Sequence, residues 1–327
     1  MRVLIIGAGI IGSIYGWALS ASGHRVVHLV RPDRAATLRE GMTLDVFDRR
    51  KRHKRNFRGV YKLIAVETLP SADNFDLVIV PVKHYALTRT LMEVVPKAGT
   101  ADFLLLTQNW NGAREIDAIL PRTRYIYGDA KAGGAFSGGM LIATLSALDI
   151  GSPVGEPSEL AEKVADLFAT ADIETNLHSD MLHYLWVQYA ITAGTWAALI
   201  RAGSMESFLN DRNAIVKALR AGCECLEVVR RRGVLVSGYP EAAPFLTNSS
   251  LRQEFYVWIM RRMFRHDEYR KRCCAHAFGD PIEIETFYAD LISAGHNLGV
   301  SMPVMESYAE DIRRFASTGT RHGTNSA

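Results

Sequence analysis

The residues best suited to chemistry lie near the start of the chain, where glycines recur at a spacing that binds phosphate groups. After an apolar run come six residues in a GxGxxG pattern: Gly7, Ala8, Gly9, Ile10, Ile11 and Gly12. The first glycine permits a tight turn, the second lets a pyrophosphate approach the backbone, and the third allows a helix to pack closely on a strand. The open amides at the helix N-terminus attract the anion. The pattern predicts a strand, a glycine turn and a helix that together bind a dinucleotide.

The residues that follow complete a βαβ unit. Residues 13–22 are typical of a helix that stops at Gly23, and residues 25–30 predict a second strand. At the end of that strand, where an NAD site usually has an acidic residue, the chain has Arg31, with Arg34 close behind. A cation suits the 2′-phosphate of NADP, so NADP is the expected cofactor. The alternative is that Arg31 is a solvated charge at a strand end.

Two further apolar runs end in polar side chains. Residues 75–82 lead directly into Lys83, and residues 103–107 are followed by Gln108 and Asn109. Because ligands bind at the carboxyl ends of parallel strands, Lys83 is expected where cofactor and substrate meet. Asn109 is a candidate for positioning a nicotinamide, since an amide bonds a carboxamide without titrating. A purely structural role in its loop is the alternative.

Composition limits the class of protein. A chain of 327 residues can bury two cores, and a net charge of +3 is too small to imply nucleic acid. We find no apolar run near the roughly 18 residues that span a bilayer, and residues 2–21 fit a folded site better than a secretory signal. The four cysteines form a CxC and an adjacent pair, which is not metal-site spacing. We expect reduced thiols, no metal and a cytoplasmic protein.

The pattern divides the chain into an N-terminal α/β region and an all-α C-terminal region. Residues 1–178 are expected to form a Rossmann-type NADP-binding domain, residues 179–316 a helical substrate or dimerisation domain, and residues 317–327 a disordered tail. The helices expected in the second domain cover residues 179–202, 212–233, 251–274, 281–298 and 303–315. A basic run from Arg49 to Arg58 is read as a solvated hairpin tip, with a localisation signal or attraction of an anionic cofactor as alternatives.

Together these features resemble the ketopantoate reductase family of NADP-dependent oxidoreductases, up to about residue 315. The similar segments are the glycine series, Gly23-His24, Arg31, Val80-Pro81-Val82-Lys83, Gln108-Asn109, Pro281-Ile282-Glu283-Ile284-Glu285 and Gly299-Val300-Ser301-Met302-Pro303. The resemblance implies a Rossmann domain and a helical domain with NADPH between them, and reduction of a 2-oxo acid to a 2-hydroxy acid. It also implies that Lys83 contacts the cofactor region, that Asn109 is the functional asparagine of its strand end, and that Glu283 is the carboxylate near the substrate.

One departure from the family concerns the general acid. The family has a lysine two residues after a tryptophan on the first helix of the second domain, and here Gln188 follows Trp186 at that spacing. Glutamine bonds a carbonyl but has no proton to give at neutral pH. The remaining proton donors are Lys83, Tyr184, Tyr189 or a water held by Glu283, although an aromatic residue such as Tyr184 is also typical of packing.

We therefore predict an NADPH-dependent reductase of a small carbonyl substrate, with Lys83, Glu283, Gln188 and Tyr184 as the catalytic candidates. One alternative is a genuine 2-dehydropantoate reductase with a relocated acid. Another is a catalytically silent NADP-binding sensor or partner protein. Neither nucleic acid nor membrane is an expected partner, and a homodimer through the first helix of the second domain is an open expectation.

Overall fold

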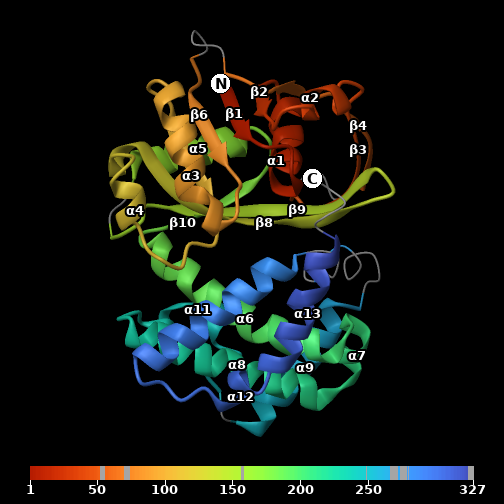
Figure 1. The fold of residues 1–327 in the computed structure, drawn as a ribbon, viewed down its shortest axis with the longest axis vertical. Coiled ribbons are helices and arrows are strands. Elements are labelled where there is room, and N and C mark those ends of the chain that lie inside the picture. The colour runs from red at the N-terminus through yellow and green to blue at the C-terminus, as the bar shows by residue number, and fades with distance from the viewer. Residues whose placement is uncertain are drawn as a thin grey trace. The chain divides into compact units, whose positions relative to one another are not determined.

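The computed structural model describes residues 1–51, 56–69, 74–155, 158–247, 249–265, 272, 278 and 280–322. The chain divides into two compact units, Met1–Leu182 and His183–Ala327, called unit 1 and unit 2 below. Figure 1 labels most of their helices and strands. Part of the basic run, residues 52–55, and the cysteine pair at 273–274 lie outside the described residues.

Unit 1 is built on a ten-stranded sheet, as far as its residues are described. The strands are β1 (Arg2–Ile6), β2 (Arg25–Leu29), β3 (Met42–Asp48), β4 (Phe57–Tyr61), β5 (Ile64–Val66), β6 (Leu77–Val80), β7 (Asp102–Leu106), β8 (Tyr125–Ser137), β9 (Met140–Gly151) and β10 (Glu174–His178). Their order is β4-β3-β9-β8-β7-β6-β1-β2-β5, with β10 paired to β9. The run β7-β6-β1-β2-β5 is parallel throughout, as in a dinucleotide-binding sheet.

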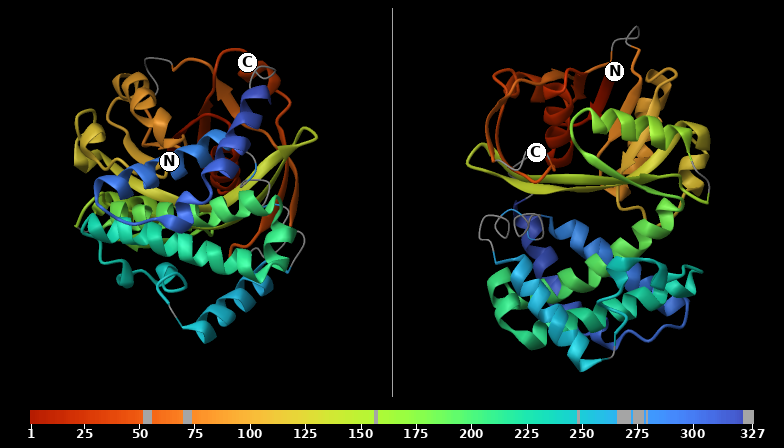
Figure 2. Two further views of the ribbon diagram at one scale, coloured as in Figure 1. Left: turned by 60° about the horizontal axis from the view of Figure 1, so that its bottom comes forward. Right: turned by 180° about the vertical axis from the view of Figure 1, so that it is seen from behind.

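The other half of the sheet differs from the sequence-based expectation. The pattern of residues 60–66 alone predicts one strand, but the structure has two here, since β4 pairs antiparallel with β3 and β5 pairs parallel with β2. A single straight strand cannot follow both neighbours, so the chain turns between Tyr61 and Ile64. The glycine-rich segments after residue 125 form one long hairpin, β8 and β9 (Figure 2). A Cβ on Gly134 would lie 2.1 Å from the Ile142 carbonyl oxygen, so only glycine fits there.

Helices cover this sheet and bury its apolar residues. They are α1 (Ile10–Ala21), α2 (Arg34–Thr37), α3 (His84–Val94), α4 (Arg114–Asp117) and α5 (Glu159–Ala169). Helix α1 is buried from Gly12 to Leu19 and packs on β8 and β9, where the Tyr15 hydroxyl donates to the Ala147 carbonyl oxygen at 2.9 Å. The Tyr15 ring also meets the Phe168 ring of α5 edge-on at 5.4 Å. The helix that presents the glycine turn is therefore held on several sides.

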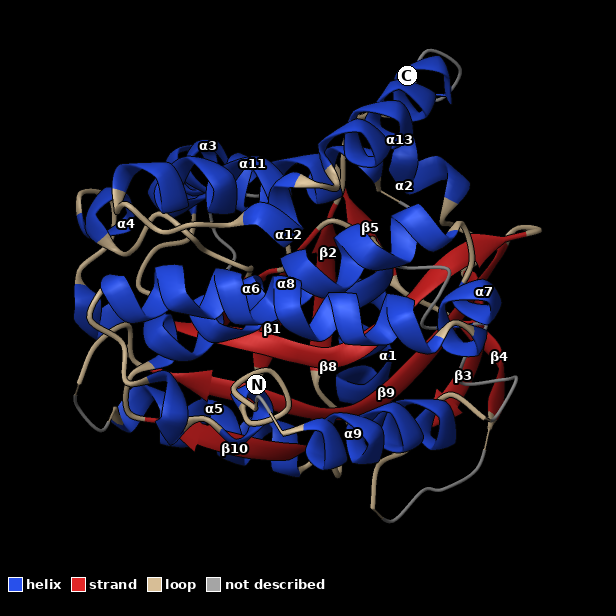
Figure 3. Cartoon of the chain, turned by 90° about the horizontal axis from the view of Figure 1, so that it is seen from below, coloured by secondary structure: helices blue, strands red, loops and turns tan. Residues whose placement is uncertain are grey.

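Unit 2 is helical throughout its described residues (Figure 3). Its helices are α6 (Met181–Ala202, whose first two residues belong to unit 1), α7 (Met205–Asn210), α8 (Arg212–Arg231), α9 (Ser250–Met263), α11 (Pro281–Asn297), α12 (Pro303–Glu306) and α13 (Ala309–His322). Helices α6 and α8 approach each other closely, because a Cβ on Gly194 would lie 2.6 Å from the Gly222 backbone nitrogen. The expected combination of a Rossmann-type sheet and an all-α region is confirmed.

Two helix ends correct the sequence-based expectation. Helix α9 ends at Met263, where a helix was expected to continue to residue 274, and most of residues 266–277 lie outside the described part of the chain. Helix α13 continues to His322, although disorder was expected from Ser317. The Ser317 hydroxyl donates to the Arg314 carbonyl oxygen at 2.7 Å, so the polar residues there bond to the helix backbone. Residues 323–327 are not described.

Candidate functional site

The glycine turn between β1 and α1 has a separate geometric reason for each glycine. Gly7 has a φ of +87°, which favours glycine, and its N–H donates to the Leu29 carbonyl oxygen at 2.7 Å. Gly9 is the N-cap of α1, and no atom lies within 4 Å of the place where its Cβ would be. A Cβ on Gly12 would lie 2.9 Å from Ile5 Cγ2, so this glycine lets α1 pack on β1. Only Gly9 thus faces open space.

The start of α1 leaves its backbone amides available. The first intrahelical bond runs from Ser13 N–H to the Gly9 carbonyl oxygen, so the amides of residues 10–12 have no partner within the helix. Helix α1 has neither a side-chain cap nor an acidic residue in its first turn. Ala8, Ile10 and Ile11 pack partly against the core and fix the turn. An open helix N-terminus beside an unfilled glycine fits the pyrophosphate of a dinucleotide.

A buried histidine supports the glycine turn, and the sequence analysis missed it. His28 Nδ1 donates to the Gly7 carbonyl oxygen at 2.9 Å, and His28 Nε2 lies 3.1 Å from the Tyr61 hydroxyl, which in turn lies 3.2 Å from Ser20 Oγ. A carbonyl oxygen only accepts, so the proton is on Nδ1 and Nε2 accepts from Tyr61. Burial lowers the pKa of His28, which favours this neutral form. The available signal was a titratable residue within an apolar strand.

The predicted cation for the 2′-phosphate follows β2. Arg31 and Arg34 are exposed, and among the described residues the Arg31 side chain makes no hydrogen bond or ion pair. The short helix α2, which begins at Arg34, is fixed by a hydrogen bond from the Ala35 N–H to Glu67 Oε1 at 3.1 Å. Both guanidinium groups are therefore available to an anion at the carboxyl end of β2.

Lys83 and Asn109 follow β6 and β7 and lie in unit 1. Lys83 is the N-cap of α3 and is partly exposed. Asn109 is buried, and its amide group donates to the Gly112 carbonyl oxygen at 2.6 Å and to the Tyr127 hydroxyl at 2.8 Å. Its Oδ1 accepts from the Asn111 N–H at 3.0 Å. Both amide hydrogens of Asn109 are therefore used within unit 1, one in its own loop and one on β8, which favours the structural alternative for this side chain.

The remaining candidates belong to unit 2. Gln188 lies on α6, and its Nε2 atom is buried without a hydrogen-bond partner in the described part of the chain. Tyr184, on the same helix, is buried, and its ring lies 6.3 Å from the Tyr239 ring. Glu283 lies in the first turn of α11 and is only 8% exposed, so it is not a surface residue. Its N–H donates to Asp280 Oδ1 at 3.1 Å.

Tyr189 connects α6 to α11. Its hydroxyl donates to Asp290 Oδ2 at 2.6 Å, and its ring lies 4.0 Å from the Phe287 ring. Burial, then the hydrogen bond to Asp290, then the charges of Asp290 and Glu283 raise the pKa of Tyr189 far above its usual range. The Tyr189 proton is thus held firmly by Asp290, which makes this hydroxyl a poor acid.

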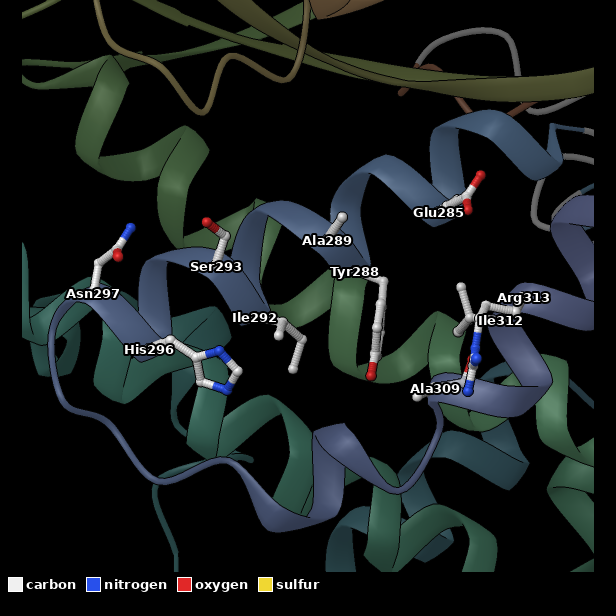
Figure 4. Close-up of a pocket in the computed structure, with 10 residues that line it drawn as sticks. All are labelled: Glu285, Tyr288, Ala289, Ile292, Ser293, His296, Asn297, Ala309, Ile312 and Arg313. Atoms are coloured by element: carbon white, nitrogen blue, oxygen red, sulfur yellow. The ribbon is translucent and has the colours of Figure 1, made fainter.

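A surface pocket of about 510 Å³ lies between α11 and α13 and includes none of the predicted site residues. Figure 4 shows Tyr288 and Ile292 extending from α11 toward α13. Elsewhere, no group of three or more potential metal ligands occurs within the described residues. In the same part of the chain, no helix has the length and apolar character needed to cross a membrane.

Comparison with known proteins gives one family. Residues 3–145 match the model described as Ketopantoate reductase PanE/ApbA. The chain is 29% identical over 196 residues to 2-dehydropantoate 2-reductase of Aquifex aeolicus. The matched segment covers 57% of this chain and 58% of that relative. The match thus spans less than two thirds of the relative's own length.

Solved structures share the fold over nearly the whole chain. The 2-dehydropantoate 2-reductase from Geobacter metallireducens has a TM-score of 0.72 at 18% identity, covering 96% of this chain and 99% of the other. D-mandelate dehydrogenase in complex with NADH has a TM-score of 0.71 at 16% identity, covering 97% and 99%. The chain is therefore similar to ketopantoate reductases over residues 3–145, which include the glycine turn, and it shares their fold over nearly its whole length.

Proposed function

We propose that this chain is an NADPH-dependent reductase of a small carbonyl substrate resembling a 2-oxo acid. The observation that carries the proposal is the glycine turn of unit 1, with open space at Gly9 and free amides at the start of α1. The exposed Arg31 at the end of β2 supports NADP over NAD, because a guanidinium pairs with a 2′-phosphate. D-mandelate dehydrogenase, which shares the fold, was solved with NADH, so the cofactor preference needs its own test.

In this proposal unit 2 contacts the substrate. Bound NADPH supplies a hydride, and the ketone oxygen gains negative charge that a donor must stabilise. Gln188 Nε2 is buried and lacks a partner among the described residues, so its N–H groups are suited to bond that oxygen. An unpaired buried donor costs free energy in the empty protein, and a ligand oxygen would remove that cost.

The proton must come from another group, because Gln188 does not titrate. Tyr189 is unsuited, since its hydroxyl donates to Asp290 and its pKa is raised. Lys83, Tyr184 and a water held by Glu283 remain the donors to be tested. Among them we rank Lys83 first, since it is partly exposed whereas Tyr184 is only 1% exposed.

The substrate is expected to differ from 2-dehydropantoate. The Aquifex aeolicus relative is named a 2-dehydropantoate 2-reductase, and that name motivates the first assay. Replacement of the family lysine by Gln188 favours a changed carbonyl substrate, while a relocated acid acting on 2-dehydropantoate is the alternative. Gln188 also favours a second candidate function, a protein that binds NADP and does not turn over.

The first test is oxidation of NADPH by the purified protein, followed at 340 nm, beside a binding titration with NADPH and NADH. The substrates are 2-dehydropantoate and a panel of 2-oxo acids, aldehydes and imines. Turnover of a panel member with NADPH supports the proposal, and turnover of 2-dehydropantoate supports the relocated acid. Tight binding of NADPH with no turnover across the panel supports the silent binder. Absence of dinucleotide binding would overturn all three.

A further inference from the structure

A network of buried charges runs across β8, β9 and β10 in unit 1. Lys131 Nζ lies 2.6 Å from Asp129 Oδ2 and 3.1 Å from Asp149 Oδ2, and His178 Nε2 lies 2.8 Å from Asp149 Oδ1. The Asp149 side chain is 4% exposed and the Asp129 side chain 12% exposed. Burying two carboxylates requires partners that remain in place, so this network is ordered rather than a solvated surface.

Gln108, at the carboxyl end of β7, is the next member of the network. Its Nε2 donates to Asp129 Oδ1 at 2.6 Å. Because an ionised carboxylate only accepts, the amide nitrogen must face Asp129 and the amide oxygen must point away from it. That oxygen, Oε1, is buried and has no hydrogen-bond partner within the described ranges of the chain. A buried acceptor left unpaired is costly, which points to a donor supplied by a ligand.

The sheet topology places Gln108 on the ligand-binding edge. Strands β7 and β8 are parallel, with Leu106 opposite Gly128, so Gln108 lies just beyond the carboxyl end of β7 and Asp129 lies beside it, within the longer strand β8. The glycine turn follows the carboxyl end of β1, which is separated from β7 by β6 alone. Arg31 lies on the β2 side of the turn, which leaves the β6 and β7 side for the nicotinamide half of a dinucleotide.

We propose that Asp129 and Lys131 are positioning residues that hold the Gln108 amide so that its oxygen accepts a hydrogen bond from the carboxamide N–H of a bound nicotinamide. This inference rests on the proposed function, since it requires a dinucleotide. Asn109 is the more obvious candidate, but its Oδ1 already accepts from the Asn111 N–H, and both its amide hydrogens are donated to Gly112 and Tyr127.

Lys131 has a specific part in this arrangement. Burial raises the pKa of Asp129, and the charge and hydrogen bond of Lys131 oppose that rise. Without Lys131, Asp129 takes up a proton more readily, and a protonated carboxyl group donates to an amide oxygen. Gln108 Oε1 is then satisfied within the protein and is no longer offered to the ligand.

The experiment compares two dinucleotides that differ at one group. In the 3-acetylpyridine analogue of NADP a methyl group replaces the carboxamide NH2, so the donor is absent and the rest of the molecule is unchanged. We expect the native protein to bind NADP about fivefold more tightly than this analogue, the value of one ordinary hydrogen bond. Gln108→Met, which keeps the side-chain length, and Asp129→Ala are expected to bind both dinucleotides equally.

Lys131→Met should lower the preference in the same way, because it acts through Asp129. The matched control is Lys163→Met, which removes another lysine–aspartate pair, Lys163 to Asp102 at 2.8 Å, at the opposite end of β7. This control should keep the fivefold preference. Circular dichroism and thermal unfolding establish that each variant is folded, and Gln108→Met alone decides the question if the charge variants do not fold.

The outcomes separate this inference from the proposed function. If the native protein binds neither dinucleotide, the proposed function itself is wrong. If it binds both with equal affinity, or if Gln108→Met keeps the preference for the carboxamide, the cofactor site stands and the assigned role of Gln108 is overturned. A preference lost in Gln108→Met and kept in Lys131→Met would remove Lys131 from the arrangement.

Discussion

In unit 1 the glycine turn is held by a chain of hydrogen bonds from Gly7 through His28 to Tyr61, whereas in unit 2 the buried amide of Gln188 lacks a partner among the described residues. The first arrangement supports a turn in which Gly9, of the three glycines of the pattern, faces open space. The second is a buried donor at the position where the resemblance implies a lysine. Under the proposed function, this contrast predicts that the cofactor half of the reaction is retained and that the proton-transfer half has changed.

The most direct test of this contrast is to place a lysine at position 188. We expect Gln188→Lys to raise the rate of 2-dehydropantoate reduction by about 10²- to 10⁴-fold, the usual contribution of a positioned general acid. The measurement is kcat with NADPH at saturating substrate. Gln188→Met, of similar length and without charge or hydrogen bonds, is the control and should give no gain. An unchanged rate in Gln188→Lys would mean that the shape of the pocket, rather than the acid, excludes this substrate.

The next largest effect tests the open glycine. Gly9→Val should leave the melting temperature nearly unchanged, because no atom lies within 4 Å of the added Cβ, yet it should block the approach of a pyrophosphate. Loss of several amide contacts predicts about a hundredfold weaker NADPH binding by fluorescence titration. Gly238→Val is the matched control, since Gly238 also faces open space and lies in unit 2. Equal affinities of both variants would show that the cofactor lies elsewhere.

The preference for NADPH over NADH tests the proposed role of Arg31 at the end of β2. Arg31→Glu should weaken NADPH binding about tenfold or more and turn the preference toward NADH, because a charge-assisted bond to the 2′-phosphate becomes a repulsion. Arg25→Glu, at the other end of β2 and also exposed, should leave the preference as it was. If the native protein binds NADH as tightly as NADPH, the argument from Arg31 fails before any substitution is made.

The His28 side chain, which supports the turn, should make the stability of the protein depend on pH. Burial lowers the pKa of His28 below its ordinary 6.5, so the unfolded chain takes up a proton at a higher pH than the folded protein. The stability from the neutral ring is therefore complete above about pH 6.5 and is lost as the pH falls through the folded value. Urea unfolding at pH 7.5 and 5.5 should show this loss in the native protein and much less of it in His28→Phe.

His28→Phe should also lower the free energy of unfolding at pH 7.5 by about 1–3 kcal/mol, since Tyr61 and Gly7 lose their shared partner. His296→Phe serves as the control, because His296 is 61% exposed by its side chain and lies in unit 2. A pH slope that persists unchanged in His28→Phe would assign the effect to another group.

The sequence predicted features whose residues lie close together along the chain, and it did not predict contacts between residues that lie far apart. The turn from Gly7 to Gly12 and the cation at Arg31 are local patterns, and their strand and helix formed as expected. The bond from His28 to Tyr61 joins residues 33 positions apart, and that from Tyr189 to Asp290 joins residues 101 apart. Such pairs depend on strand order and helix packing, which local periodicity does not encode.

The smallest effect is expected at Tyr189. Because its hydroxyl donates to Asp290 at 2.6 Å and burial raises its pKa, Tyr189→Phe should change kcat for any accepted substrate by less than about threefold. The cost should appear in stability instead, at about 1–3 kcal/mol, because Asp290 loses a buried partner. Tyr184→Phe provides the comparison, as it removes a hydroxyl from the same helix at a residue that is still a candidate donor. If Tyr189→Phe abolished turnover while Tyr184→Phe did not, the Asp290 carboxylate would be passing the proton through Tyr189, and unit 2 would have rebuilt its acid rather than lost it.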